Sequence, residues 1–323
     1  MSSSFPVAGA CAEMKLKMES AKKAKKMIND AHIAGAECVK FQCHVIDDEM
    51  IPEAKNVIPG NAKESIWSIV NRCAFTEDQD YEIKKYTENL GLIYLSTPFS
   101  RAAANRLNKM GVLAYKIGSG ECNNYPLVEH IASFGKPIIL STGMNNLASI
   151  KIAVKIFEKY KTPYILLHCT SMYPTPYEKV RLGALKDLKK NFPNAILGLS
   201  DHSLGIYTSL GATALGASVI EKHFTSSMKW KGPDIPISIT PKELSELIIG
   251  SNAIWKAAGG KKDILKEEQP TIDFAYACVV SIKDIKKGEK FTKENIWVKR
   301  PGTGEIKAID FEKVLSKKAS CDI

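Results

Sequence analysis

Short apolar runs rich in β-forming residues recur eight times along the chain, and amphipathic stretches separate them. Eight strand-then-helix units over about 250 residues are typical of a closed parallel barrel. The main alternative is a doubly wound open sheet, but no GxGxxG turn follows the first run. The sequence therefore predicts an α/β protein, a (β/α)8 TIM barrel. The runs are residues 6–13, 37–42, 91–98, 112–119, 137–143, 164–171, 195–202 and 217–224.

The pattern changes near residue 265. The charged segment 261–270 ends in proline and is typical of a linker, and short strands and turns follow it. We expect a catalytic barrel over residues 1–264, then a linker and a small β-rich module over 265–323. The segment 43–77 is long for a strand-to-helix connection, which predicts a lid or an interface.

The chain carries a formal net charge of +10, but only five of its 45 basic residues are arginine. The lysines lie mostly on presumed helix faces, where a solvated surface explains them. No zinc-finger spacing, helix-turn-helix signature or basic stripe interleaved with aromatics is present, so we expect no nucleic-acid partner. A positive field suits a small anionic substrate.

The same sequence bears on location and redox state. No apolar run reaches the roughly 18 residues of a membrane span. The first residues lack the basic-then-apolar plan of a secretory signal. The eight cysteines are scattered without a CxxC pair, which predicts reduced, mostly structural thiols. We therefore expect a cytoplasmic protein with no membrane partner.

Polar or ionisable residues end every predicted strand. Because the carboxyl ends of barrel strands converge on one mouth, residues distant in sequence become neighbours there. A single polar residue can simply mark where a strand meets a loop, but the whole set indicates a site. These residues are Glu13; Lys40 and Gln42; Thr97; Lys116, Ser119 and Glu121; Ser141 and Thr142; His168, Thr170 and Ser171; Ser200, Asp201 and His202; Glu221, Lys222 and His223.

His202 and His223 end adjacent strands, so both imidazoles can reach one divalent cation. Two protein ligands with open coordination positions suit a metal that acts as a Lewis acid on a substrate carbonyl. Either histidine alone is better explained as a hydrogen-bonded core residue, but the pair predicts a metal site. Asp201 either orients a ligand or lies behind the site.

Lys40 and Lys116 supply cationic donors suited to a phosphate and a carboxylate. A Schiff base on Lys116 or Lys222, as in covalent aldolases, is a competing interpretation. Lys222 alternates with His223 along its strand, so we expect it to point away from the lumen and form a structural ion pair. The hydroxyls expected beside the two cationic donors are those of Thr97, Ser119, Ser141 and Ser200.

Nine motifs then occur in order across nearly the whole chain: KFQ (40–42), STPF (96–99), KIGSGECNNYPL (116–127), STGM (141–144), HCTSMYPTP (168–176), SDHSLG (200–205), EKHFT (221–225), GPD (232–234) and KRPGTG (299–304). Together they resemble the N-acetylneuraminate (sialic acid) synthase family, which includes legionaminate and pseudaminate synthases. GECNNYPL and VKRPGTG are most similar to the bacterial N-acetylneuraminate synthases.

The resemblance implies a barrel followed by an antifreeze-like (SAF) module, in a domain-swapped homodimer whose modules each cover the partner's active site. It implies condensation of phosphoenolpyruvate with N-acetylmannosamine and water to give N-acetylneuraminate and phosphate. It also implies a divalent cation, manganese or magnesium, that polarises the aldehyde of the open-chain sugar.

Carried over position by position, the resemblance assigns roles to single residues. Glu13 matches the glutamate that positions or deprotonates the attacking water, and His202 and His223 match the metal ligands. The catalytic set is Glu13, Lys40, Lys116 and Asp234. Phosphoenolpyruvate-binding positions are Lys40, Thr97, Lys116, Ser119, Ser141, Ser171 and Ser200; sugar-binding positions are Gln42, Glu121, Tyr173 and Asp234, with Phe274 and, from the partner's module, Arg300 closing over the sugar.

Three departures from the family pattern are present. The loop after Glu13 reads MKLKMES (14–20), without the usual glycine and Asn-His pair and one residue shorter. Ser171 occupies a position that some relatives fill with asparagine. The chain stops at SCDI, where relatives usually continue for about another turn of the module, so the SAF fold is expected to be incomplete and the placement of Arg300 weaker.

These departures leave alternatives to the leading interpretation. One is a synthase for a related nonulosonate such as legionaminate, distinguished by contacts from Tyr173, Phe274 and segment 43–77. Another is a catalytically impaired sugar-phosphate binding protein, which the altered 14–20 loop makes conceivable.

Overall fold

The computed structural model describes residues 9–13, 20–60, 63–232 and 234–323, with the backbone alone for residues 9–13 and Ser20. The chain divides into two compact units, Met1–Gly259 and Gly260–Ile323. The predicted boundary after residue 264 lies within the first residues of the second unit. Each unit has its own hydrophobic core.

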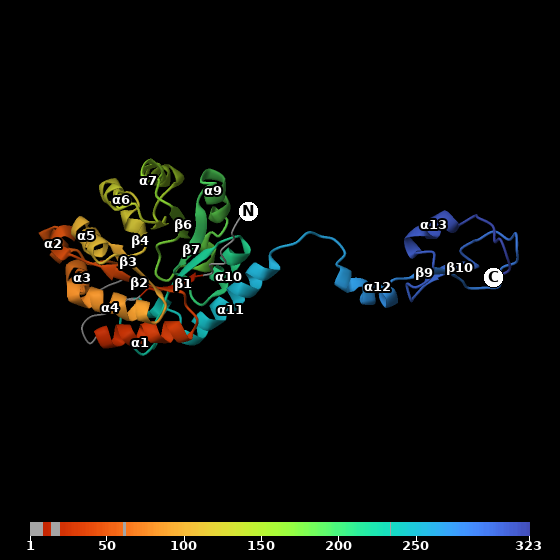
Figure 1. Cartoon of the computed structure of the whole chain (residues 1–323), viewed down its shortest axis with the longest axis horizontal. Coiled ribbons are helices and arrows are strands. Elements are labelled where there is room, and N and C mark those ends of the chain that lie inside the picture. Colours follow the sequence, from red (N-terminus) through yellow and green to blue (C-terminus); the bar gives the residue numbers. More distant parts are fainter. Residues whose placement is uncertain (1–8, 14–19, 61–62, 233) are drawn as a thin grey trace. The chain divides into compact units, whose positions relative to one another are not determined.

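The first unit contains eight parallel strands ringed by helices (Figure 1). Parallel ladders join neighbours in the order β3-β2-β1-β8-β7-β6-β5-β4, so the first strand pairs with the last, as in a barrel. β3 and β4 lie against each other without a ladder among the described residues. The predicted TIM barrel is confirmed. Its strands are β1 (Gly9–Glu13), β2 (Cys38–Cys43), β3 (Ile93–Pro98), β4 (Tyr115–Ile117), β5 (Ile138–Ser141), β6 (Tyr164–Cys169), β7 (Ile196–Asp201) and β8 (Val219–His223).

The helices that cover the strands begin at residues suited to helix N-termini. Thr76 forms a capping box with Gln79, and Thr240 forms one with Glu243. The hydroxyl of Ser100 caps the helix that begins at Arg101. The helices are α1 (Ser20–Ile33), α2 (Ile46–Glu49), α3 (Ile66–Cys73), α4 (Glu77–Asn89), α5 (Arg101–Lys109), α6 (Tyr125–Ala132), α7 (Leu147–Lys159), α8 (Tyr177–Val180), α9 (Ala184–Asn191), α10 (Tyr207–Ala214) and α11 (Pro241–Ala257). Short 3-10 turns are η1 (Pro52–Asn56), η2 (Ser119–Glu121) and η3 (Ile235–Ile237).

Alternation along each strand separates core from lumen. In β2, Val39 and Phe41 are buried in the cluster that packs against the surrounding helices, whereas Lys40 and Gln42 line a cavity in the barrel. The same division holds in β4, where Tyr115 and Ile117 join that core cluster. The hydrophobic effect therefore fixes the outward residues, and the register leaves the polar ones at the mouth.

The second unit is smaller and less regular. Its elements are η4 (Lys266–Glu268), α12 (Gln269–Ala275), β9 (Cys278–Ser281), β10 (Ile296–Lys299), η5 (Ala308–Asp310) and α13 (Phe311–Val314). β9 and β10 form an antiparallel pair over a core of Ile285, Ile296 and Ala319. The predicted linker, residues 261–270, ends inside α12. Pro270 occupies a first-turn position of this helix, where its missing N–H costs nothing.

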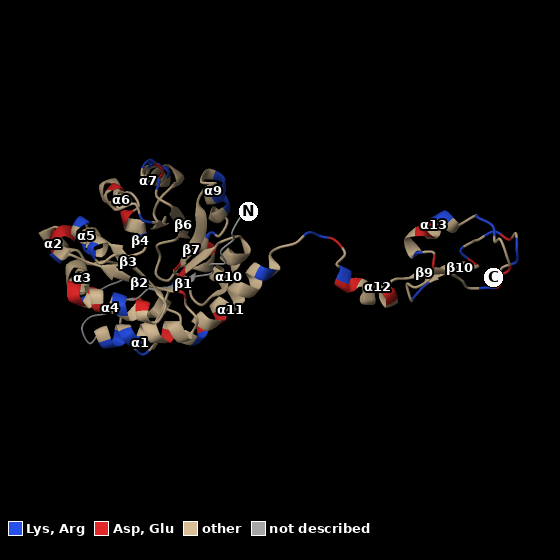
Figure 2. Cartoon of the chain, viewed as in Figure 1, with Lys and Arg blue, Asp and Glu red and all other residues tan. Residues whose placement is uncertain are grey.

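Charge is spread over the surface of both units. Figure 2 shows lysines and arginines on several barrel helices and on the second unit, with acidic residues among them. No helix in the described part of the chain is long and apolar enough to cross a membrane. The segment 43–77 is built mainly from α2, η1 and α3.

Candidate active site

Inward-facing side chains from seven of the eight strands, or from the turns that follow them, meet in one cavity of about 180 Å³. The cavity gathers residues that are up to 183 positions apart in the sequence, since Lys40 and His223 both line it. Eleven of the predicted site residues line this cavity: Lys40, Gln42, Thr97, Lys116, Ser119, Ser141, Ser171, Tyr173, Ser200, His202 and His223. The other lining residues are Phe99, Gly118, Gly120, Met144, Cys169 and Glu221.

The floor of the cavity holds two buried ammonium groups and one carboxylate. Oε1 of Glu221 lies 3.5 Å from Nζ of Lys116 and 3.8 Å from Nζ of Lys40. The same carboxylate accepts a 2.9 Å hydrogen bond from Ser200, while Lys116 donates to Ser141 at 2.7 Å. These three ionic groups together carry a formal charge of +1 in a place shielded from water, which favours an anion.

The sequence places Glu221 at a strand end but assigns it no role in binding or catalysis. It lies two positions before His223 on the same strand, and period-two alternation therefore places both in the lumen. That alternation was the signal that could have found it.

Beside the ammonium groups, hydroxyls converge on Gly143. The backbone N–H of Gly143 donates to Oγ of Ser119 at 3.0 Å. A Cβ at Gly143 would stand 2.4 Å from Oγ of Ser171 and 2.8 Å from Oγ of Ser119, so only glycine leaves room for this cradle. The hydroxyls of Ser171 and Thr97 are buried and have no hydrogen-bond partner within the described structure. Buried polar groups of this kind are rare without a ligand or water, so they indicate a binding site.

The two predicted metal ligands lie together at the mouth. The rings of His202 and His223 have centroids 5.2 Å apart, and Tyr173 lies over His202 at 4.3 Å. Nδ1 of His202 lies 3.0 Å from the carbonyl oxygen of Thr170, so this nitrogen donates and Nε2 keeps the lone pair that could bind a metal.

The donor set fits an open metal site rather than a closed one. No group of three or more His, Cys, Asp or Glu side chains is arranged to hold a metal among the residues the structure describes. Two imidazoles leave several coordination positions for substrate or water, as a Lewis-acid site requires. Oδ2 of Asp234 lies 3.8 Å from Nδ1 of His223 and faces it from the turn before η3.

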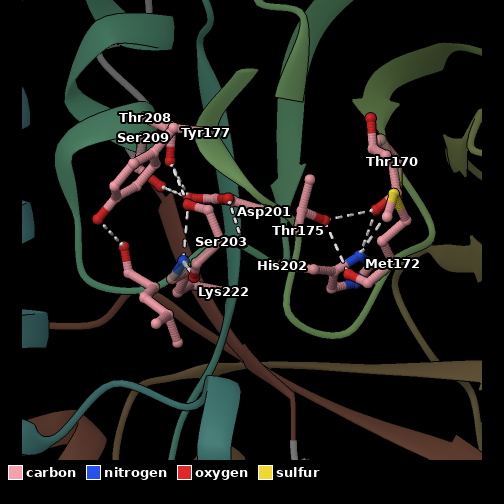
Figure 3. Close-up of polar contacts among 12 residues, drawn as sticks. Thr170, Met172, Thr175, Tyr177, Asp201, His202, Ser203, Thr208, Ser209 and Lys222 are labelled. Carbon is pink, nitrogen blue, oxygen red and sulfur yellow. Dashed lines mark hydrogen bonds and ion pairs between the residues drawn. The ribbon is translucent and has the colours of Figure 1, made fainter. Parts of the chain in front are cut away.

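Asp201 and Lys222 point away from the lumen. Lys222 donates to Asp201 at 3.0 Å, and both side chains are almost completely buried. Thr208 and Ser209 also donate to Asp201. In Figure 3 the contacts of Asp201 and those of its neighbour His202 form two separate groups. The expected structural ion pair of Lys222 is thus present, and Lys222 is poorly placed for a Schiff base in the cavity.

Of the four predicted sugar-binding residues in the first unit, Gln42 and Tyr173 line the cavity, and Glu121 and Asp234 do not. Glu121 ends η2 and accepts a 2.7 Å hydrogen bond from Asn124. Burial raises the pKa of the Glu121 carboxyl, with a smaller contribution from the nearby charge of Glu49. Tyr173 is 43% exposed, so it can move against a bound molecule.

Besides Glu121 and Asp234, three further predicted residues are not among the described residues that line the cavity. The backbone of Glu13 is paired with Lys40 on one side and His223 on the other, at the level of the mouth, but its side chain lies outside the described residues. The altered loop 14–20 lies outside them as well, apart from the backbone of Ser20. Phe274 and Arg300 belong to the second unit, where both are exposed.

Comparison with known proteins agrees with this geometry. A model of the NeuB family matches residues 27–263, and a model of the SAF domain matches residues 276–323. The chain is 39% identical to the N,N'-diacetyllegionaminic acid synthase of Campylobacter jejuni over 92% of this chain and 91% of that protein. It is 32% identical to the human N-acetylneuraminate-9-phosphate synthase over 85% of this chain and 78% of that protein.

A solved structure of a synthetase is also similar to this chain. The crystal structure of the N-acetylneuraminic acid synthetase from Leptospira borgpetersenii, in complex with citrate, superposes with a TM-score of 0.75 at 34% identity. The match covers 83% of this chain and 90% of that one.

Proposed function

The chain belongs to the NeuB family, and from that premise we propose that it is an N-acetylneuraminate synthase that joins phosphoenolpyruvate to N-acetylmannosamine. Enzymes of this family condense phosphoenolpyruvate with an acetamido sugar, and the chain is an enzyme of this class. The observation that carries the proposal is the cavity itself, where two buried lysines and orphaned hydroxyls adjoin a histidine pair.

The anion site accounts for phosphoenolpyruvate. Its phosphate and carboxylate bind the ammonium groups of Lys40 and Lys116 and the hydroxyl cradle, in charge-assisted hydrogen bonds. Thr97 and Ser171 gain the partners that they lack. The remaining hydroxyls are those of Ser119, Ser141 and Ser200.

The sugar occupies the mouth, where Gln42, Glu121, Tyr173 and Asp234 hold it in its open-chain form. A divalent cation, manganese or magnesium, bound by His202 and His223 would supply Lewis-acid polarisation of the sugar's aldehyde. The sugar-binding side chains also orient the aldehyde carbon of the sugar toward C3 of phosphoenolpyruvate. This proximity supplies much of the rate.

The reaction then proceeds by two bond-forming steps. C3 of phosphoenolpyruvate attacks the aldehyde carbon, the aldehyde oxygen takes a proton, and C2 becomes electron-poor. Water adds to C2 and gives its proton to Glu13. The bond between C2 and the bridging oxygen of the phosphate breaks, the hydroxyl on C2 gives its proton to the departing phosphate, and C2 becomes the ketone carbon of N-acetylneuraminate. Lys40 and Lys116 balance the negative charge of the departing phosphate.

A related substrate is the second candidate. The similarity to the C. jejuni N,N'-diacetyllegionaminic acid synthase favours a sugar that carries two acetamido groups. The reaction would use the same anion site, because the two substrates differ at the rim and not at the reacting carbons.

The proposal is tested by phosphate release. Purified protein is incubated with phosphoenolpyruvate and either N-acetylmannosamine or a diacetamido hexose, with manganese or with a chelator. We expect metal-dependent phosphate release that is fastest with N-acetylmannosamine, and its loss in His202→Ala. Preference for the diacetamido sugar would identify the second candidate. No release with any sugar would exclude both, and a borohydride-trapped pyruvate adduct on a lysine would replace the mechanism by a Schiff base.

We also propose that two chains form a homodimer in which each SAF module covers the partner's cavity and supplies Phe274 and Arg300. The exposure of both side chains on the second unit supports this. Arg300→Ala and His202→Ala chains, each weakly active, should complement each other when mixed, because one site in the mixed dimer has an intact barrel and an intact module. About a quarter of wild-type activity is expected from random pairing. Absence of complementation would contradict the swap.

A further inference from the structure

The side chain of Gln42 contacts His44, a residue with no part in the proposed mechanism. His44 follows β2 by one residue, and its Nε2 lies 3.2 Å from Oε1 of Gln42. Its other ring nitrogen, Nδ1, lies 2.8 Å from Oε2 of Glu49 at the end of α2. His44 is 7% exposed and does not line the cavity, so it acts there only through another residue.

The ring of His44 is fixed in the remaining directions by Phe99. The two rings are stacked, with centroids 4.7 Å apart and planes 12° from parallel. The stack prevents tilting, and the polar contacts on both nitrogens prevent rotation within the plane. Phe99 and Gln42 both line the cavity, so the fixed imidazole links two parts of its wall.

The hydrogen-bond chemistry of this chain sets the direction of the Gln42 amide. A carboxylate and an amide carbonyl only accept, so the ring satisfies both at once with a proton on each nitrogen. Oε1 of Gln42 is then taken by His44, and the amide N–H groups lie on the other arm of the same planar group. The carboxylate of Glu49 lies against this ring, and the side chains of both residues are nearly buried.

We propose that His44, held by Glu49 and Phe99, is a positioning residue that fixes the Gln42 amide so that it presents hydrogen-bond donors, not an acceptor, to the sugar. This inference rests on the proposed function, because it deepens the role of a residue in the same site. Because Glu49 belongs to α2, the long segment 43–77 then takes part in sugar selection. Substrates with an acceptor oxygen opposite Gln42 are favoured.

A double-mutant cycle tests the kinetic part. His44→Phe keeps the stack on Phe99 and removes both polar contacts, Gln42→Ala removes the amide, and the third variant carries both changes. His32→Phe, the same substitution on an exposed residue of α1, is the matched control. KM values for sugar and for phosphoenolpyruvate are measured by phosphate release, and thermal unfolding shows that each variant is folded.

We expect His44→Phe to raise the sugar KM about tenfold and the phosphoenolpyruvate KM less than about twofold. The double variant should be no worse than Gln42→Ala alone, since His44 acts only through that amide. A double variant whose loss equals the product of the single losses would overturn the proposal. So would an equal rise in both KM values, which is the sign of general disruption.

A second measurement stands apart from turnover. In protein labelled with 15N-histidine, the resonances of His44 are identified as those missing from His44→Phe. Both ring nitrogens should carry protons in the wild type, and Glu49→Gln should leave one of them without its proton. A singly protonated ring in the wild type would overturn the inference. If the wild type released no phosphate with any sugar, the proposed function would fail, while this spectrum would still decide the state of His44.

Discussion

The carboxylate of Glu221 stands 3.5 Å from the ammonium group of Lys116, and both side chains are at most 5% exposed. Lys40 approaches the same carboxylate from β2, which only β1 separates from the strand of Glu221. The site is therefore stabilised by an internal carboxylate before substrate binds, and an incoming anion adds negative charge next to the same two cations.

Glu221→Gln should destabilise the substrate-free protein by about 3 kcal/mol, because it removes the negative charge beside two buried ammonium groups. Phosphoenolpyruvate should raise the melting temperature of this variant more than that of the wild type. Thermal unfolding with and without phosphoenolpyruvate measures both effects. Glu129→Gln, which breaks the exposed pair with Lys159, should leave the melting temperature essentially unchanged. Equal melting temperatures for the two variants would contradict the role of Glu221.

Thr97→Val should stabilise the substrate-free protein and impair it as an enzyme. The Thr97 hydroxyl is buried without a partner in the described structure, and removing such a group gains about 1 kcal/mol. The same hydroxyl is a binding group for phosphoenolpyruvate in our proposal, so the KM for phosphoenolpyruvate should rise several-fold. Urea unfolding and steady-state kinetics measure the two effects. A destabilised variant with an unchanged KM would show that the hydroxyl is structural.

Gly143→Ala should displace the hydroxyls of Ser119 and Ser171, since the new Cβ would lie within 2.8 Å of both oxygens. We expect kcat/KM for phosphoenolpyruvate to fall about 100-fold, as for a misplacement of about 1 Å in a catalytic site. Serine side chains can rotate, so the fold should persist. Gly183→Ala is the control, because a Cβ there meets nothing within 4 Å. Equal kcat/KM values for the two variants would argue against the cradle.

Asp80 should make the stability of the protein depend on pH. Burial raises the pKa of its carboxyl to about 6, against the opposing effect of Arg106 at 3.0 Å. Because the folded pKa lies above the unfolded one, the contribution is complete below about pH 4 and is lost as the pH rises through 6. Between pH 5 and pH 7 the protein should lose about 1 kcal/mol from this group.

Asp80→Asn isolates that effect, since an amide keeps an acceptor for Arg106 and does not titrate. Urea unfolding at pH 5 and pH 7 should show a smaller pH dependence in the variant than in the wild type. An identical pH dependence in the two proteins would rule out Asp80 as its source.

Much of the fold and part of the site follow from local patterns. The eight units predict the barrel because each needs only its own apolar face and a covering helix. Alternation within β8 predicts that Lys222 points outward and His223 inward. The same alternation places Glu221 on the inward side. Eleven predicted residues line one cavity because the carboxyl ends of barrel strands must converge.

Other relations could not be read from the sequence. The relay from Glu49 through His44 to Gln42 depends on how α2 folds back over the end of β2, which no periodicity specifies. The approach of Ser119 and Ser171 to Gly143 depends on three separate loops. Asp80 became a buried partner of Arg106 although it lies in an acidic first turn that would suit solvent.

The sequence by itself determined which side chains face the lumen, because strand alternation and apolar burial act over a few neighbouring residues. Only the tertiary structure decided which of those side chains touch. Barrel closure sets the distances between Glu221, Lys116 and Lys40, and it does so through register between strands that are far apart in the chain. Coulombic and hydrogen-bond energies change steeply over an ångström, so the chemistry of the site is fixed at that last step.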